Sequence, residues 1–430
     1  MSEIATMNVK EQFLSTFGVQ DFHFDTEASK AARNEATKRI EGLEFPTSKT
    51  EYWKYTRINR IVKAEYKIAE STTTIDITPF LIEGMEKNVM VFVNGFYRAD
   101  ISTITSQEGV IACALSEAKE KHADLFNAYF SKYLPTDEIF ANINTAFHQD
   151  GAFIHFAKKQ KADQPIHILN LVEGDQIITN PRNLIIGEAF SEGKVVTSYH
   201  NLNGGKSFTN AVNECFAAEN SYLEFNKLQE EDGTSFHIAT DQVQQEKSGN
   251  FTINTFTFNG DIVRNNLNIA VAGENGYTSL NGFYLPKEKQ LVDNHTRVDH
   301  LVPHCESHEL YRGVIDDKAT AVFNGKVMVH RDAQKTNAFQ ANNNVLLSDD
   351  ATINSKPELE IYADDVKCSH GSTIGQLDEE AIFYLRARGL SEDSAIRLLL
   401  NAFAADVLEH VGIESFRQLI EEKIENGLKK

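Results

Sequence analysis

The sequence predicts a mainly β protein, with a stacked β-solenoid core and helical regions at its N-terminal and C-terminal ends. Between residues 151 and 362, short apolar or alternating runs such as FIHF and IHILNLV recur. Asn, Gly, Asp and Ser separate them at roughly ten-residue intervals, which is typical of strands joined by turns. No convincing helical segment interrupts this series. About two hundred residues is twice the length of an immunoglobulin-like sandwich, so successive coils around one continuous core are favoured, although no strict repeat is visible.

The composition is that of a globular protein with a strong negative charge. Of the 430 residues, 41% are hydrophobic and the formal net charge is -20, so we expect no nucleic-acid partner, because a phosphate backbone would be repelled. Residues 1–18 lack a basic segment followed by an apolar one, and no apolar run could span a bilayer. We therefore expect neither a signal peptide nor a membrane partner. Four scattered cysteines without a CxxC pair indicate a reducing, cytoplasmic setting.

The N-terminal region, residues 1–85, is predicted to be mostly helical. Residues 27–43 are rich in Ala, Arg, Glu and Lys, which favour a helix, and Gly42 offers a stop. A proline-containing loop follows, and its Trp53 is expected to anchor this segment on the body of the protein. Residues 88–97 (NVMVFVNGFY) contain an Asn-Gly pair between apolar runs, which predicts a β-hairpin.

Helical spacing of apolar residues returns in two further places. Residues 116–133 predict a helical insertion near the start of the core. In the tail, Asp378 can cap a helix that ends at Gly389, Ser391 can cap a second, and a third follows Gly412. The apolar stripe of the second helix usually packs on its own domain, and a partner surface is the alternative.

These elements divide the chain into three predicted parts. Residues 1–85 form an N-terminal helical region, residues 86–370 a β-helix core with the insertion near 116–133, and residues 371–430 a C-terminal helical region.

Two short motifs are coincidental matches to nucleotide-dependent enzymes. Gly204-Gly205-Lys206-Ser207 resembles the end of a phosphate-binding loop, but His200 stands where the first glycine belongs, and the motif lies between strand-like runs. His330-Arg331-Asp332 with Asn337 has the spacing of a kinase catalytic loop, yet neither a suitable glycine-rich loop nor Asp-Phe-Gly accompanies it.

Cys368 and His370 are candidate metal ligands at the seam between the strand-like and helical regions. In an extended segment, residues i and i+2 point to the same side, so the thiol and the imidazole would be presented together. Both are good ligands for iron and other thiophilic metals. Two donors do not close a site, so ligation, with further donors from elsewhere, and structural burial both stay open.

A second group of candidates is the histidine-rich stretch from His295 to His308. In a strand, His300, His304 and His308 would lie on one face and could converge on a metal. Pro303 interrupts a regular strand and the spacing fits no specific zinc pattern. We therefore expect satisfied polar groups in turns here.

Six further motifs lie between Pro303 and Gly389: PHCES (303–307), YRGV (311–314), AVFNGK (321–326), AQKTNAFQ (333–340), PELEIYADDVKCSHG (357–371) and FYLRARG (383–389). Together they resemble the SufB/SufD family of the SUF iron–sulfur cluster assembly system. Near the N-terminus, FPT (45–47) with EYWKYT (51–56) is more similar to the SufD branch than to the SufB branch.

The resemblance implies a right-handed parallel β-helix flanked by helical regions. It implies a subunit that pairs with a SufB-like subunit through the β-helix ends and binds a SufC-like ATPase through its C-terminal helices. Cys368 and His370 match family residues implicated in cluster formation at the SufB interface, where the partner supplies a further cysteine. The residues that would contact the ATPase are Asp378, Phe383, Tyr384, Arg386, Arg388, Leu399 and Phe403.

The resulting expectation is a non-enzymatic scaffold subunit that helps to assemble and transfer nascent clusters. The lone chain would hold no firmly bound cofactor, only iron or a cluster transiently in the complex, and it would form a homodimer when isolated. Two alternatives are a β-helix polysaccharide-active enzyme and a purely structural dimerisation module. The missing signal peptide and the absence of a clear acidic calcium cluster in the sequence argue against the enzyme.

Overall fold

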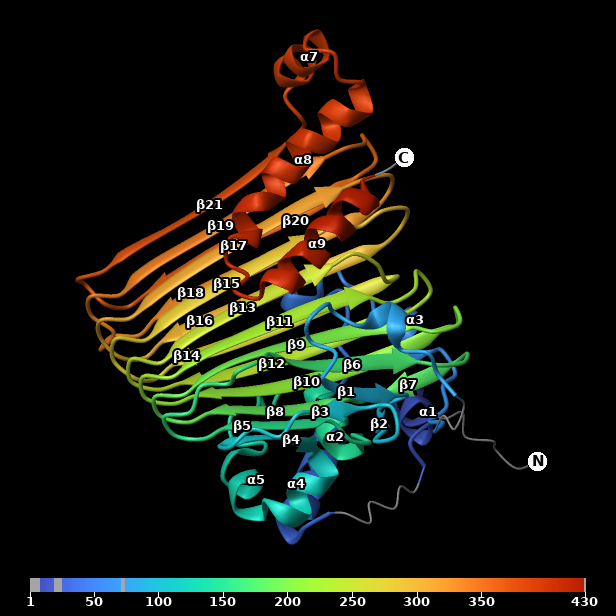
Figure 1. The fold of residues 1–430 in the computed structure, drawn as a ribbon, viewed down its shortest axis with the longest axis vertical. Coiled ribbons are helices and arrows are strands. Elements are labelled where there is room, and N and C mark those ends of the chain that lie inside the picture. Colours follow the sequence, from blue (N-terminus) through green and yellow to red (C-terminus); the bar gives the residue numbers. More distant parts are fainter. Residues whose placement is uncertain (1–7, 19–24, 71–73, 429–430) are drawn as a thin grey trace.

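The computed structural model describes residues 8–18, 25–70 and 74–428, and its strands wind into one long solenoid (Figure 1). Each coil contributes one strand to each of two sheets, and each strand pairs in parallel with the corresponding strand of the next coil. The predicted parallel β-helix is confirmed. The coils share no sequence repeat. Their register is set by the alternation of inward and outward residues, because a slip of one residue would turn every apolar side chain to the outside.

The first sheet has eleven strands and the second has ten. The first sheet consists of β1 (Asn88–Val93), β2 (Phe96–Tyr97), β3 (Thr103–Ile104), β6 (Ile166–Val172), β9 (Glu192–Asn201), β11 (Tyr222–Glu230), β13 (Asn250–Thr257), β15 (Tyr277–Tyr284), β17 (Glu306–Ile315), β19 (Asn337–Leu346) and β21 (Lys367–Gly375). The second consists of β4 (Val110–Ala114), β5 (Ala152–Phe156), β7 (Ile177–Thr179), β8 (Arg182–Gly187), β10 (Ser207–Ala217), β12 (Phe236–Gln245), β14 (Ile262–Val271), β16 (Leu291–His300), β18 (Thr320–Val329) and β20 (Thr352–Ile361).

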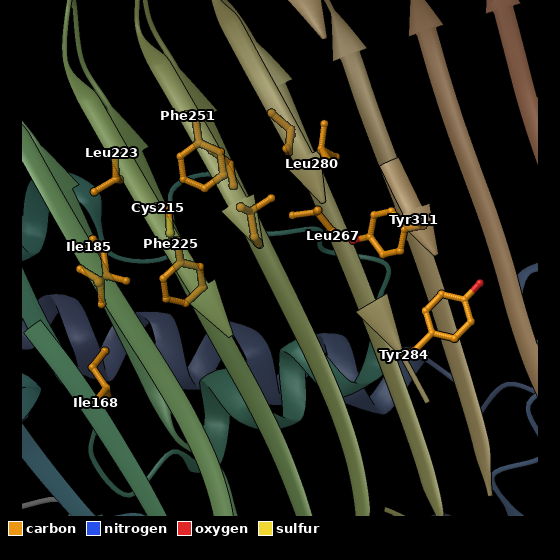
Figure 2. Close-up of a cluster of buried hydrophobic side chains, with 14 of the residues drawn as sticks. Ile168, Ile185, Cys215, Leu223, Phe225, Phe251, Leu267, Leu280, Tyr284 and Tyr311 are labelled. Atoms are coloured by element: carbon orange, nitrogen blue, oxygen red, sulfur yellow. The ribbon is translucent and has the colours of Figure 1, made fainter. Parts of the chain in front are cut away.

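The inward side chains of both sheets form one continuous apolar core along the solenoid. Phe225, Ile253 and Leu280 occupy the same register position on successive coils and are each fully buried. Figure 2 shows this cluster, with Cys215 and Leu267 supplied by the second sheet. Stacking equivalent positions in this way buries apolar area on every coil, which is the main source of stability in such a fold.

The N-terminal helices cover the outer face of the second sheet. They are α1 (Val9–Ser15), α2 (Glu27–Gly42) and α3 (Asn59–Val62), followed further on by α4 (Leu115–Lys121), α5 (Ala123–Tyr129) and α6 (Ile139–Phe147). Trp53 lies 7% exposed in this layer, and the Arg264 guanidinium stands 3.7 Å from its ring centroid. The anchoring role expected of Trp53 is therefore what its packing provides.

The C-terminal helices α8 (Glu392–Leu408) and α9 (Glu414–Gly427) cover the outer face of the first sheet. Leu400 and Phe416 are buried there against Phe256 and Phe283 of β13 and β15. The predicted caps are formed: Ser391 accepts a hydrogen bond from the Ser394 N–H. Helix α7 (Glu379–Ala387) instead projects beyond the end of the sheets (Figure 1) and has no buried residue.

The solenoid is closed at its N-terminal end, which we call the closed end. The inward residues of its first strand, Met90 and Phe92, are 0% and 1% exposed. Tyr97 and Ile104 of β2 and β3 pack on this core, because a tight turn at Asn94 and Gly95 folds β2 back along β1 in an antiparallel hairpin. The hairpin predicted for residues 88–97 is confirmed.

Candidate functional site

The last coil, formed by β20 and β21, leaves the C-terminal end of the solenoid uncovered. The inward residues of β21 are Cys368, His370, Ser372 and Ile374, whose register partners are the buried, alternating residues Ala338, Gln340, Asn342 and Asn344 of β19. Ile374 is 54% exposed and Ile361, at the end of β20, is 41% exposed. We call this surface, made by the inward rows of β20 and β21, the open end.

Cys368 and His370 both lie in β21, so the extended geometry on which their pairing depended is present. They share the inward face, two residues apart, at register positions 338 and 340 of the preceding coil. A thiol and an imidazole in this arrangement suit iron, but two donors leave its coordination incomplete. Within the described residues, no group of three or more His, Cys, Asp or Glu side chains is arranged to hold a metal ion.

Cys368 is the one half-buried cysteine; the other three are buried. It packs beside Val327, Ala333 and Ala338. Burial raises the pKa of the Cys368 thiol, and a backbone hydrogen bond with Ala338 only partly offsets this. The side chain is therefore a thiol at neutral pH, and a metal that binds it must displace the proton.

A buried polar row lies directly beneath His370. Gln340 is its register partner in β19, and Glu309 is the partner of Gln340 in β17. Gln340 Nε2 donates a 2.7 Å hydrogen bond to Glu309 Oε2, and Thr296 Oγ1 donates one of 2.5 Å to Oε1. Sequence reasoning missed this pair, although polar residues at inward positions of an alternating strand were the available signal.

The histidines between His295 and His308 point in different directions. His300 is buried inside the solenoid, where its Nε2 lies 2.9 Å from Ser307 Oγ. His295 contacts Asp293 beneath the N-terminal segment, while His308 stacks on Phe339 outside. His304 occupies a turn with a φ of 62°. Their spacing therefore does not bring them to one site.

The two enzyme-like motifs fall in connections between strands. Residues 204–207 lie between β9 and β10, with Ser207 as the first residue of β10. Residues 330–332 follow β18 directly. Neither motif starts a helix, as a phosphate-binding loop requires.

The candidate partner-binding residues in and next to α7 are all exposed. Phe383 is 75% and Tyr384 58% exposed. Arg388 donates to the Tyr384 hydroxyl at 3.1 Å, and Arg386 pairs with Glu392 of α8 at 3.0 Å. Asp378 caps the helix by accepting from the Glu380 N–H. The helix thus presents two aromatic rings and two guanidinium groups to solvent.

Helix α8 divides its candidates between two surfaces. Phe403 lies against the solenoid, with the Arg312 guanidinium 4.8 Å from its ring centroid, and Arg312 also pairs with Asp406. Leu399 is half-buried, and Leu398, which the sequence did not single out, is 50% exposed. The exposed apolar surface next to α7 is therefore centred on Leu398.

Comparison with known proteins identifies the family. Residues 170–403 match the family model described as "SUF system FeS cluster assembly, SufBD core domain", and residues 7–168 match "SufBD protein N-terminal region". The chain belongs to the SufBD family. It is therefore a SUF scaffold subunit of iron–sulfur cluster assembly, as its motifs predicted.

Relatives of this SufBD chain match it along nearly its whole length. A SufBD family protein of Synechocystis is 31% identical over 90% of this chain and 88% of its own. The iron–sulfur cluster assembly protein SufD of Escherichia coli is 29% identical over 94% of this chain and 96% of its own. SufD of Bacillus subtilis is 23% identical over 98% and 99%. These names agree with the predicted SufD branch.

None of the helices in the described ranges is both long and apolar enough to cross a membrane.

Proposed function

We propose that this SufBD chain pairs through its open end with a SufB-like subunit and contributes Cys368 and His370 to a shared site. A nascent iron–sulfur cluster would be assembled there as cargo. The observation that carries the proposal is that the two donors stand together on the inward face of the last, uncovered coil.

The open end has the features of a surface that a second protein completes. Its inward row exposes Ile361 and Ile374, which a solenoid otherwise buries. The outer edges of β20 and β21 terminate their sheets, so their backbone groups are available to strands of a partner. A partner docked here would also supply the ligands that Cys368 and His370 lack.

We propose that a SufC-like ATPase binds α7 and the adjoining face of α8. Phe383, Tyr384 and Leu398 expose apolar surface there, flanked by Arg386 and Arg388. Aromatic and arginine side chains are the residue types that most often anchor protein interfaces. Because Arg312 of β17 binds α8, a movement of α7 and α8 would be transmitted to the solenoid.

In this proposal the chain performs no catalysis itself, and ATP hydrolysis belongs to the separate ATPase. The isolated chain would form a homodimer by pairing two open ends, and it would act in the cytoplasm. It would hold iron or a cluster only transiently, in the complex.

The test replaces the two donors and leaves the fold intact. The complex is co-purified anaerobically with its SufB-like and SufC-like partners, and iron and acid-labile sulfide are measured for Cys368→Ala and His370→Ala. Both variants are expected to lower cluster content several-fold at unchanged complex yield. The control is Ser369→Ala, because Ser369 lies between the two donors and is exposed on the other face. Normal cluster content in both donor variants would refute the site.

A further inference from the structure

The inward row that ends at His370 continues into the solenoid as Gln340 and then Glu309. Adjacent strands place such partners about 4.8 Å apart with their side chains on the same face. Gln340 and Glu309 are 3% and 4% exposed, whereas His370 is exposed at the open end. Two buried polar side chains thus lie in line beneath one candidate ligand.

Glu309 fixes which way the Gln340 amide points. Both Glu309 oxygens accept hydrogen bonds, Oε1 from Thr296 and Oε2 from Gln340 Nε2. While Glu309 is ionised, the amide nitrogen is therefore held toward it. Gly325 on the opposite sheet leaves room for this arrangement, because a Cβ there would stand 2.3 Å from Gln340 Nε2.

The carbonyl oxygen of the same amide, Gln340 Oε1, accepts no hydrogen bond. Gln340 Oε1 is buried and has no hydrogen-bond partner in the structure. An unpaired buried carbonyl oxygen is costly, of order 1–3 kcal/mol, so its retention calls for an explanation. A donor from the adjacent row would satisfy it, and the residue in that row is His370.

We propose that Gln340 is a positioning residue for His370: Gln340 Oε1 accepts the imidazole N–H and leaves the other ring nitrogen free to bind metal. Glu309 acts through Gln340 by holding its amide in the accepting orientation. A histidine ligand commonly donates its second N–H to a carboxylate or carbonyl oxygen, which fixes the tautomer and the ring orientation. The metal part of this inference rests on the proposed function; the Gln340–His370 contact does not.

The proposed contact would make the site depend on whether the open end is covered. In the isolated chain His370 is exposed, so water competes for its N–H. A partner seated on the open end would exclude that water and leave Gln340 Oε1 as an acceptor in the neighbouring row. Closure would then select one imidazole tautomer.

The first experiment tests the contact without metal. The full chain, labelled with ¹⁵N-histidine and bound to its SufB-like partner, is examined by NMR, and the His370 signals are assigned with His370→Ala. The wild type is expected to show one dominant tautomer, while Gln340→Met gives a mixture. The matched control is Asn344→Leu, since Asn344 is equally buried in β19 but lies beneath Ile374. An unchanged tautomer in Gln340→Met overturns the inference, as does an equal change in the control.

The second experiment measures the consequence, with Co²⁺ alone as the probe of the same complex. Gln340→Met is expected to weaken Co²⁺ binding about 10- to 100-fold, with Asn344→Leu nearly unchanged. The exchanged pair Glu309→Gln with Gln340→Glu keeps an oxygen toward His370 and should restore binding. Failure of the exchange to restore it counts against the orientation argument. If the tautomer responds to Gln340→Met but His370→Ala leaves Co²⁺ affinity unchanged, the contact stands and the proposed metal site is wrong.

Discussion

The two ends of the solenoid are built from the same kind of coil but are finished differently. At the closed end, Met90 and Phe92 are fully buried because a hairpin folds β2 and β3 over them. At the open end, Ile374 occupies the equivalent inward position and is 54% exposed. Met90 and Phe92 contribute to the stability of this chain, whereas the inward row of β21 gains that stability only when something covers it.

This difference separates inward residues that stabilise the isolated chain from inward residues that are exposed and available for association. An uncovered solenoid end exposes apolar side chains and strand edges, both of which favour association. The chain covers one end with its own residues and leaves the other bare at the coil that carries Cys368 and His370. Stability measurements on matched substitutions at the two ends should therefore diverge.

The largest divergence is expected for Phe92→Ala compared with Ile374→Ala. Removing the buried ring leaves a cavity at the closed end, so we expect the free energy of unfolding to fall by about 3–5 kcal/mol. Ile374→Ala should lower it by less than about 1 kcal/mol, since half of that side chain already contacts water. Chemical denaturation of the two variants measures both values. Equal losses would contradict the distinction between the ends.

A second contrast concerns two buried carboxyl groups. Burial raises the pKa of Glu309 from 4.5 to about 7, because no cation accompanies its hydrogen bonds. Burial also opposes ionisation of Asp25, but the charges of Lys119 and Arg33 hold its pKa below the ordinary value. The ionised form of Glu309 is thus disfavoured by folding, and that of Asp25 is favoured.

The two groups should therefore give opposite pH dependences of stability. The folded state retains the Glu309 proton between pH 4.5 and about 7 while the unfolded state loses it, so stability falls as pH rises through this window. Glu309→Gln should remove that fall and increase the free energy of unfolding above pH 7. Asp25→Asn should decrease the free energy of unfolding at neutral pH. The ionised Asp25 stabilises the fold there, and the wild type loses this contribution only in acid. Denaturation at several pH values tests both, with the exposed Glu425→Gln as a charge control.

Much of the fold could be predicted because the signals are local. The Asn-Gly pair produced the 88–97 hairpin, and the caps at Asp378, Ser391 and Gly389 produced α7 and α8. Helix α6 was not predicted, since Ile139–Phe147 is only nine residues long, which is short for a periodic signal, and is buried on nearly all sides. The pairing of strands about thirty residues apart has no local signal, because the coils share burial and not sequence.

A third contrast compares a thiol near each end. Burial raises the pKa of Cys113 near the closed end to about 12, and Cys113 is 8% exposed. Burial also raises the pKa of the Cys368 thiol, but this side chain is only half-buried. Iodoacetamide should label Cys368 first, faster at higher pH, and Cys113 only on unfolding, as mass spectrometry of tryptic peptides can determine. Labelling of Cys113 at a comparable rate would indicate that the closed end opens readily.

The candidate site was predictable in part. Spacing alone placed Cys368 and His370 on one face, and β21 has the extended form that this required. Their roles stay predictions, because no third donor of the described residues is grouped with them. Residue spacing could not predict that Gln340 and Glu309 lie in the same row as His370. The three residues are aligned only by the strand register of three successive coils. Leu398 was not predicted, because the apolar pattern of α8 does not distinguish the leucines that face the solenoid from those that face solvent.

The smallest effect on stability is expected in α7. Phe383→Ala should change the free energy of unfolding by less than about 0.5 kcal/mol, because the ring is 75% exposed. The same substitution should weaken binding of the SufC-like ATPase by tenfold or more if the ring anchors that interface. Calorimetry of the variant and of the control Glu380→Ala, on the same helix, separates these results. Unchanged ATPase affinity would exclude Phe383 from the contact.

Hydrogen–deuterium exchange of the full chain, with and without its SufB-like partner, tests most directly whether the open end is completed by a second subunit. Those amides of Thr352–Ile361 and Lys367–Gly375 that point away from β18 and β19 should exchange quickly alone and become protected in the complex, because their strands gain a neighbour. Peptides covering Asn88–Val93 and Val110–Ala114 at the closed end should exchange equally in both states. Protection confined to the closed end, or unchanged exchange in β20 and β21, would contradict the account.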